Sequence, residues 1–322
     1  MRLSLLDRSR TRAGTSDAAA VTATVARAVD AEAQGYHRFW VAEHHAVPGI
    51  ASGAPPVLLA ALGARTTRLR LGSGGVMLPL HQPLVVAEQF LLLEALHPGR
   101  IDLGLGRSLG FTPPVRRALR REDQDAADFE ADLEELRGLL TGTGEVTARP
   151  AAGGTVPMHV LAVRHGVDVA GRLGLPVVVG GPDLGSDEMV RSLADYRRTF
   201  RPWRGSKPSV TISLDVTVAD DDATARDLAL PEAWAMAQAR RTGEFPPLRP
   251  VGAILDEPWP DQVRTRVEAS LDRAVAGGPA SVRRRLEQLV ERTGADELMA
   301  STSTYDTDAL RESDRLLRDL VA

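Results

Sequence analysis

The sequence predicts an α/β fold, a (β/α)8 TIM barrel with inserted loops that forms one domain over residues 1–322. Eight short segments have strand character, and most are separated by stretches long enough for a helix. No fixed-period repeat and no Pro/Gly/Ser linker divides the chain. Because each parallel pair needs a crossover that covers the sheet, this alternation favours a closed barrel with helices outside. An open doubly wound sheet is the alternative.

The predicted strands are short, and each is apolar or alternates between apolar and polar residues. They are Arg2–Leu6, Arg38–Ala42, Arg68–Gly72, Ile101–Leu105, Met158–Val163, Pro176–Val179, Val210–Val218 and Glu297–Ala300. The strongest pattern is that of Val210–Val218, where Val, Ile and Leu alternate with Thr, Ser and Asp. A period of two residues is typical of a strand with one buried face.

The predicted helices lie between and after these strands. They are Asp17–Gln34, Pro55–Arg65, Pro83–Leu96, Arg116–Leu140, Val167–Leu173, Asp187–Tyr196, Ala223–Arg241 and, in pieces, Gln262–Thr293. Asp17 and Asp187 are expected N-caps, while Gly35 and Gly174 stand where a left-handed residue ends a helix. The stretches Thr141–Pro157 and Thr242–Pro260 are interpreted as inserted loops.

Composition excludes several functions. The net charge of −4 does not favour nucleic acid as a partner, and no apolar run reaches the roughly 18 residues that cross a bilayer. Met1–Asp7 has no signal-peptide pattern, so a cytoplasmic location is expected. The chain has no cysteine, which removes disulfides, thiolate nucleophiles and cysteine metal sites. Catalysis must therefore use other side chains or a cofactor.

The segment Tyr36–His45 is the strongest indication of a site, because a buried strand runs directly into Glu43, His44 and His45. Ionisable groups at the mouth of a strand indicate chemistry, with a solvated turn as the alternative. His44 suits proton transfer near neutral pH. Adjacent residues on an extended chain face opposite ways, so no metal site is expected from these three. His81 either lines the pocket or stabilises its loop, and His37, His97 and His159 are interpreted as structural.

Two glycine-rich segments follow the third and fourth predicted strands, Gly72–Gly75 and Gly104–Gly110. Both miss the spacing of the dinucleotide-binding fingerprint, and no phosphate-binding loop of the ATPase kind occurs. Glycines allow a backbone to approach a flat group or to adopt unusual peptide geometry. Together with Glu43 and His44 they follow three successive strands, where a barrel of this type places its active site.

The stretch from Phe39 to Gly110 resembles the bacterial luciferase-like flavin monooxygenases, and most closely a branch found in antibiotic biosynthesis clusters. The motifs that carry the resemblance occur in the family's order and spacing. They are AEHH, GSGGVMLP, HQP, AEQF, LHPGRIDLG and GR. Glu291–Met299 and Thr302–Asp306 resemble the family's last helix and strand.

The resemblance implies a flavin-dependent monooxygenase in which His44 is catalytic and Glu43 orients or tunes it. It implies a non-proline cis peptide at Gly74–Gly75 that supports the flavin ring, and an Arg107 that binds the flavin phosphate. The residues expected at the cofactor are Ala42, Gly74, Gly75, Gly106, Arg107, Arg164 and His165. The expected partners are reduced FMN supplied by a flavin reductase, O2 and a small-molecule substrate, together with a second copy of the chain through Leu84–Leu96.

One turn departs from the family pattern. Where the family has Ser/Thr hydroxyls at the phosphate, this chain reads Leu161–Asp168 without them. Arg164 and His165 at the predicted helix start would replace the hydroxyls by charge, since a helix N-terminus favours an anion. The departure leaves two alternatives open, an F420-dependent oxidoreductase and a flavin-independent or non-catalytic barrel. The substrate is not predicted.

Overall fold

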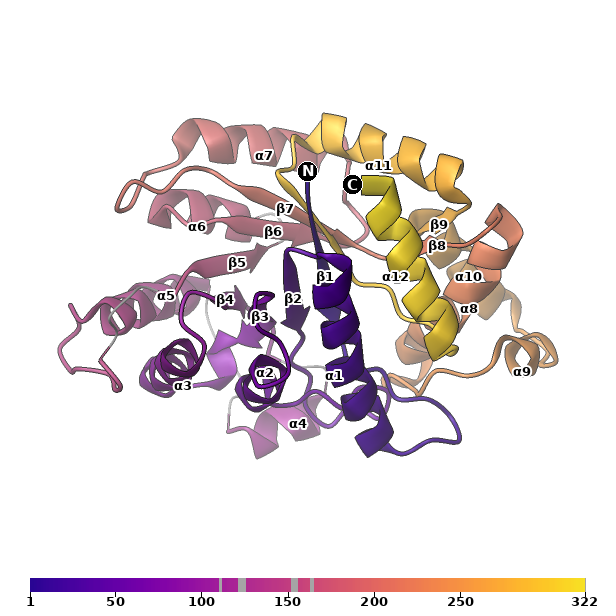
Figure 1. Cartoon of the computed structure of the whole chain (residues 1–322), viewed down its shortest axis with the longest axis horizontal. Helices are drawn as coiled ribbons and strands as arrows, with labels where there is room; N and C mark the ends of the chain where they lie inside the picture. Colours follow the sequence, from indigo (N-terminus) through magenta and orange to yellow (C-terminus); the bar gives the residue numbers. More distant parts are fainter. Residues whose placement is uncertain (110–111, 121–125, 152–155, 163–164, 322) are drawn as a thin grey trace.

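The computed structural model describes residues 1–109, 112–120, 126–151, 156–162 and 165–321 (Figure 1). Eight parallel strands close into a barrel in the order β1-β10-β7-β6-β5-β4-β3-β2. They are β1 Arg2–Asp7, β2 Arg38–Val41, β3 Arg70–Met77, β4 Ile101–Gly106, β5 Met158–Ala162, β6 Val177–Gly180, β7 Val210–Leu214 and β10 Glu297–Ala300. The predicted barrel is confirmed, and the open sheet is excluded because each of these eight strands pairs with two others, which leaves no edge strand among them.

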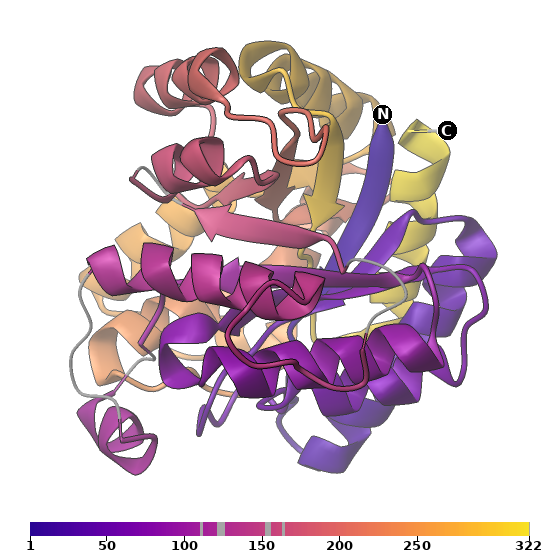
Figure 2. The same ribbon diagram turned by 90° about the vertical axis from the view of Figure 1, so that its left-hand side faces the viewer.

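Helices surround this barrel (Figures 1 and 2). They are α1 Asp17–Gln34, α2 Pro55–Gly63, α3 Pro83–Leu96, α4 Pro113–Ala118, α5 Ala126–Thr141, α6 His165–Leu173, α7 Asp187–Thr199, α8 Asp222–Thr242, α9 Val251–Leu255, α10 Asp261–Arg273, α11 Pro279–Thr293 and α12 Thr307–Val321, with a 3-10 turn η1 at Leu78–Leu80. Gly35 and Gly174 have φ of 80° and 67°, as predicted for residues that end helices.

Several predicted boundaries are wrong. Val210–Val218 forms two strands, because Asp215 interrupts it and β8 (Val216–Val218) pairs instead with β9 (Val275–Gly277). Arg116–Leu140 also divides, since the left-handed Arg120 follows the end of α4. The helix α12 was not predicted. The N-caps are Ser16 and Ser186 rather than the aspartates that follow them, because each serine side chain accepts a backbone N–H of the first turn.

Alternation along each strand separates the outer core from the barrel interior. On β2, Phe39 and Val41 belong to the large apolar core that the helices cover. Trp40 belongs instead to a small interior cluster with Val178 and Met299, against which Leu6 and Leu161 pack. The interior is therefore closed by an apolar layer at mid-height.

Below that layer, at the amino ends of the strands, lies a floor of buried charges. Arg38 donates to Asp102 at 2.7 Å and to Glu297 at 2.9 Å, and Arg70 contacts the other oxygen of Asp102. His159 lies 3.9 Å from Asp102 and packs edge-on against Trp40. Burying such charges is tolerated because each carboxylate has a cationic partner.

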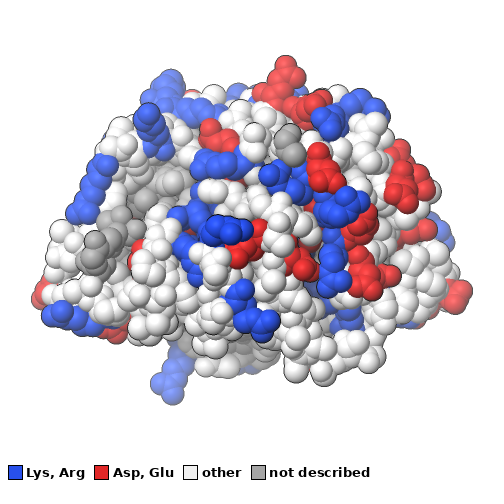
Figure 3. Space-filling view, viewed as in Figure 1, with Lys and Arg blue, Asp and Glu red and all other residues white. Residues whose placement is uncertain are grey.

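A second apolar cluster lies beside the barrel, between α8, α9 and α10. Trp234, Ile254 and Val267 are among its buried members. Charged side chains of both signs intermingle on the face drawn in Figure 3. Among the described residues, no helix combines the length and the apolar character needed to cross a membrane.

Candidate active site

A cavity of about 640 Å³ opens at the carboxyl ends of the barrel strands. Its base is the apolar interior layer, through Leu6, Leu161 and Met299. Its walls bring together residues from far apart in the sequence, namely Glu43, His44, Gly74, Gly75, Gly106 and Arg107. A volume of this size accommodates a multi-ring organic molecule.

One wall of the cavity is backbone rather than side chain. Strand β3 continues through Gly72–Gly75 to Met77, so the predicted end of this strand at Gly72 is wrong. Its pairing with β4 shifts register between Ser73 and Val76, and a cis peptide bond joins Gly74 to Gly75, as the family resemblance implies. A side chain at Gly75 would come within 2.8 Å of the Gly104 carbonyl oxygen.

Other glycines of these two strands make room for a tryptophan. A Cβ on Gly72 would lie 2.5 Å from the Trp40 indole nitrogen, and a Cβ on Gly104 would lie 2.1 Å from the Ser73 carbonyl oxygen and 2.9 Å from the Trp40 ring. The flat group that lies against Gly72 and Gly104 is therefore the indole ring of Trp40.

Glu43, which follows the neighbouring strand β2, is the polar centre of the adjoining part of the wall. Its Oε1 accepts hydrogen bonds from Nε2 of His45 at 2.5 Å and of His81 at 2.6 Å, and its Oε2 accepts the backbone N–H of Met77 at 2.9 Å. Burial alone would raise the pKa of Glu43, but these hydrogen bonds outweigh it and lower the pKa to about 2. Glu43 is therefore a carboxylate at all ordinary pH values.

His44 is positioned by its backbone. Its N–H donates to the carbonyl of Ser52 at 2.8 Å, and the Ser52 hydroxyl donates to the carbonyl of Ala42 at 2.5 Å. Burial, reinforced by the nearby cations Arg8 and Arg10, lowers the pKa of His44 to about 4. Its imidazole is neutral at neutral pH.

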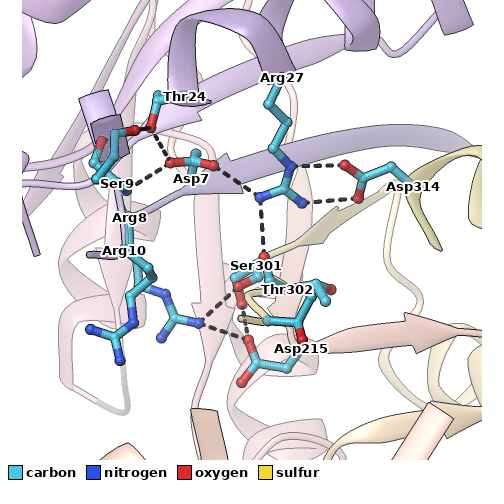
Figure 4. Close-up of polar contacts among 12 residues, drawn as sticks. Asp7, Arg8, Ser9, Arg10, Thr24, Arg27, Asp215, Ser301, Thr302 and Asp314 are labelled. Carbon is cyan, nitrogen blue, oxygen red and sulfur yellow. Dashed lines mark hydrogen bonds and ion pairs between the residues drawn. The ribbon is translucent and has the colours of Figure 1, made fainter. Parts of the chain in front are cut away.

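The cations behind His44 belong to a buried charge network (Figure 4). Arg8 donates to Asp215 at 3.0 Å and to the Ser301 carbonyl at 2.8 Å, while Arg10 donates to Glu232 at 2.9 Å. Farther along, Arg27 joins Asp7 to Asp314 through charge-assisted hydrogen bonds. This network ties the ends of β1, β7 and β10 together at the rim.

The far side of the cavity is open and glycine-rich. Gly166, Gly180 and Gly181 line it, and the exposed Arg107 follows β4. Helix α6 begins at His165, so its N-terminal turn is next to this wall. Arg164 and the side chain of His165 lie outside the described residues.

Most of the sequence-predicted site residues therefore meet in one cavity, but Ala42 does not line it. Sequence reasoning missed Met77, Ser213 and Ser301, which also line the wall. Ser213 could have been predicted from the alternation along β7. Its neighbour Ile212 faces the outer core, so the side chain of Ser213 faces the barrel interior. Ser301 directly follows β10, the position where a barrel of this type places site residues, but it was not assigned to the site.

Comparisons with known proteins show which family the chain resembles over its length. A family model for luciferase-like monooxygenases matches residues 1–297. The luciferase-like monooxygenase of Escherichia coli strain K12 is 37% identical over 325 residues, which cover 98% of this chain and 96% of that protein. The crystal structure of apo-MsnO8 is similar with a TM-score of 0.90 at 33% identity, over 99% of this chain and 98% of that chain.

Two more distant structures share the fold with different cofactors. The oxygenating constituent of 3,6-diketocamphane monooxygenase from Pseudomonas putida, in complex with FMN, has a TM-score of 0.76 at 19% identity and covers 100% of this chain and 98% of its own. An F420-dependent secondary alcohol dehydrogenase has a TM-score of 0.72 at 13% identity, and the match covers 100% of this chain and 99% of that chain. Neighbours of this fold thus include FMN-bound and F420-dependent proteins.

Proposed function

This chain belongs to the luciferase-like monooxygenase family, and on that premise we propose that it binds reduced FMN at the barrel mouth and uses O2 to oxygenate a small organic molecule. The observation that carries the proposal is the meeting of His44, the Gly74–Gly75 peptide and Arg107 around one cavity of about 640 Å³. These residues come from β2, β3 and β4 or the loops that follow them, which are neighbouring strands of the barrel.

The residues present fit a flavin. Six glycines line the cavity, so a flat ring system can approach the backbone closely at these positions. The Gly74–Gly75 peptide would support the ring. At the open side, the Arg107 guanidinium offers a fork of donors to a phosphate, and the N-terminal turn of α6 favours an anion.

Bound reduced flavin would supply the electrons for oxygen chemistry, which protein side chains cannot provide. The chain's own groups hold the substrates, exclude water and move protons. Leu6, Leu161 and Met299 give the base of the cavity an apolar surface that excludes water. His44 holds or releases a proton at its imidazole, and Glu43 keeps the polypeptide beside it in place through Met77 and two histidines.

The experiment that tests this proposal compares FMN with riboflavin, which lacks only the phosphate. Anaerobic titration of the purified chain with reduced FMN should change the flavin absorbance and fluorescence at one site per chain. Arg107→Gln should weaken FMN binding about 10- to 100-fold and leave riboflavin binding unchanged, because only the charge-assisted phosphate contact is removed. Riboflavin is the internal control for correct folding.

Three outcomes of that titration contradict the proposal. F420 binding in place of FMN would favour the alternative of an F420-dependent oxidoreductase. Failure of every flavin to bind would favour a non-catalytic barrel. FMN binding that is indifferent to Arg107 would place the phosphate elsewhere.

We also propose two protein partners. A flavin reductase would deliver reduced FMN through the open side of the cavity. A second copy of the chain would cover the apolar face of α2 and α3, where Val57, Val85, Leu92 and Leu96 are exposed by 72%, 44%, 53% and 58%. Exposed apolar side chains grouped on neighbouring helices are typical of a subunit interface.

A further inference from the structure

Three metal-ligating atoms converge at the edge of the cavity, around the carboxylate of Glu43. Oε1 of Glu43 lies 2.5 Å from Nε2 of His45 and 2.6 Å from Nε2 of His81, and the three atoms all fall within 4.8 Å of one another. The Glu43 side chain is 1% exposed, while those of His45 and His81 are 19% and 29% exposed.

The chain builds this cluster from two loops. Glu43 and His45 are two residues apart after β2, so their side chains fall on the same side of the extended segment, while His44 between them lies outside the cluster. The third member, His81, follows the turn η1 at the end of β3. No metal site was expected from Glu43, His44 and His45, because adjacent side chains on an extended chain point to opposite sides. The same rule places Glu43 and His45, which are two residues apart, on one side.

We propose that Glu43, His45 and His81 bind one divalent ion of the Zn²⁺ class. Two imidazoles and one carboxylate match the ligands of open zinc sites, which leave a fourth position for water or another ligand. Imidazole nitrogen disfavours Mg²⁺ and Ca²⁺, which prefer oxygen. Each histidine would bind through Nε2 with its proton on Nδ1, and the two short N–O contacts would open as the ion replaces the hydrogen bonds between them.

The surroundings support an ion at this place. The second oxygen of Glu43 accepts the Met77 N–H at 2.9 Å, which orients the carboxylate so that Oε1 faces the histidines. Such outer contacts fix ligand geometry in metal sites. His45 also lines a separate cavity of about 300 Å³ beside Pro48, Met236 and Phe245.

The test uses the untagged full-length chain without flavin, dialysed against a chelator and then titrated with Zn²⁺ in competition with a chromophoric chelator. One ion should bind per chain, and Co²⁺ should give visible absorption bands of a nitrogen-ligated site. His81→Ala should weaken Zn²⁺ binding by at least about 100-fold, since a ligand is lost and outer contacts alone contribute 10- to 100-fold. His81 is part-exposed, so this variant is expected to fold.

His37→Gln is the matched control, because it removes a histidine that precedes β2, at the end of that strand away from Glu43 and His45, and it should bind Zn²⁺ like the wild type. Absence of stoichiometric binding would overturn the proposal, as would equal binding by His81→Ala and the control. Because no flavin is present, a failure here is independent of whether FMN binds at the neighbouring cavity.

Discussion

At the scale of single residues, the site depends on how two neighbours along the chain divide their roles. Glu43 is held by three hydrogen bonds and remains ionised, whereas His44 is kept neutral by burial and by Arg8 and Arg10. A carboxylate that is fully engaged cannot easily exchange protons. His44 is therefore the group on this wall that can take up and release one.

Replacing His44 with alanine should slow turnover without unfolding the chain. We expect kcat to fall by roughly 100- to 10,000-fold, the usual contribution of a general acid or base. FMN affinity and the unfolding temperature should change little, since His44 is only partly buried. The rate would be measured with the first substrate that the wild type accepts from a screen of ketones, aldehydes and thioethers.

His37→Gln provides the control, because His37 precedes the strand that His44 follows. Its turnover should match the wild type. Undiminished turnover in His44→Ala would remove His44 from the mechanism.

His159 gives the fold a pH dependence. Burial lowers its pKa to about 4, against about 6.5 when unfolded. As the pH falls from 6.5 to 4 the unfolded chain takes up this proton first, so the free energy of unfolding decreases by up to roughly 3 kcal/mol. Urea unfolding of His159→Gln over this range should show a shallower decrease than the wild type. Identical slopes for the two proteins would refute this assignment.

At the scale of elements, β3 and β4 are shaped around Trp40. A methyl group at Gly72 would lie 2.5 Å from the indole nitrogen and 2.9 Å from Cβ of Asp102. Glycine at this position thus lets a large aromatic ring fill the barrel interior between a charged floor and an open mouth.

Gly72→Ala should destabilise the protein by about 1–3 kcal/mol, the usual cost of overpacking. Combining it with Trp40→Phe should cost less than the sum of the two single changes, because the smaller ring leaves room for the methyl group. Urea unfolding of the four proteins measures this coupling. Gly106→Ala is the control, since its Cβ would meet nothing nearer than 3.9 Å. If the two changes in the free energy of unfolding simply add, the predicted tight contact between residue 72 and Trp40 is contradicted.

Element boundaries were predictable only where local chemistry decides them. Asp17–Gln34 and Pro83–Leu96 are helices with the predicted ends, because a glycine in the left-handed conformation ends the first and a proline begins the second. Val210–Val218 was mispredicted because its alternation is unbroken. What divides it is tertiary, since Asp215 binds Arg8 and Ser301, and the N–H of Val216 donates to the Thr302 hydroxyl.

At the scale of the whole molecule, the barrel was predictable from strand–helix alternation, and so was the meeting of Glu43, His44, Gly74 and Arg107 at its mouth. His81 was not assigned to Glu43, because no local pattern shows which carboxylate a loop histidine reaches across the barrel rim. The same limit applies to Arg8 and Glu232, which are 224 residues apart in the sequence and form a buried ion pair at 3.0 Å.

The exposed face of α2 and α3 predicts a dimer. Leu92→Glu should convert a particle of two chains into one of a single chain, since it places a charge at the centre of the proposed interface. Light scattering coupled to size-exclusion chromatography measures the mass. Val146→Glu is the control, because Val146 has nearly the same exposure, 52% against 53%, but lies after α5. A wild type that is already a single chain would contradict the proposed interface.

The most direct measurement is a crystal structure of this chain with FMN. We expect the flavin ring to lie in the barrel mouth against the Gly74–Gly75 peptide, within reach of His44. Its phosphate should lie at Arg107 and the start of α6. A flavin bound elsewhere, or a mouth that stays closed to flavin at saturating concentration, would contradict it.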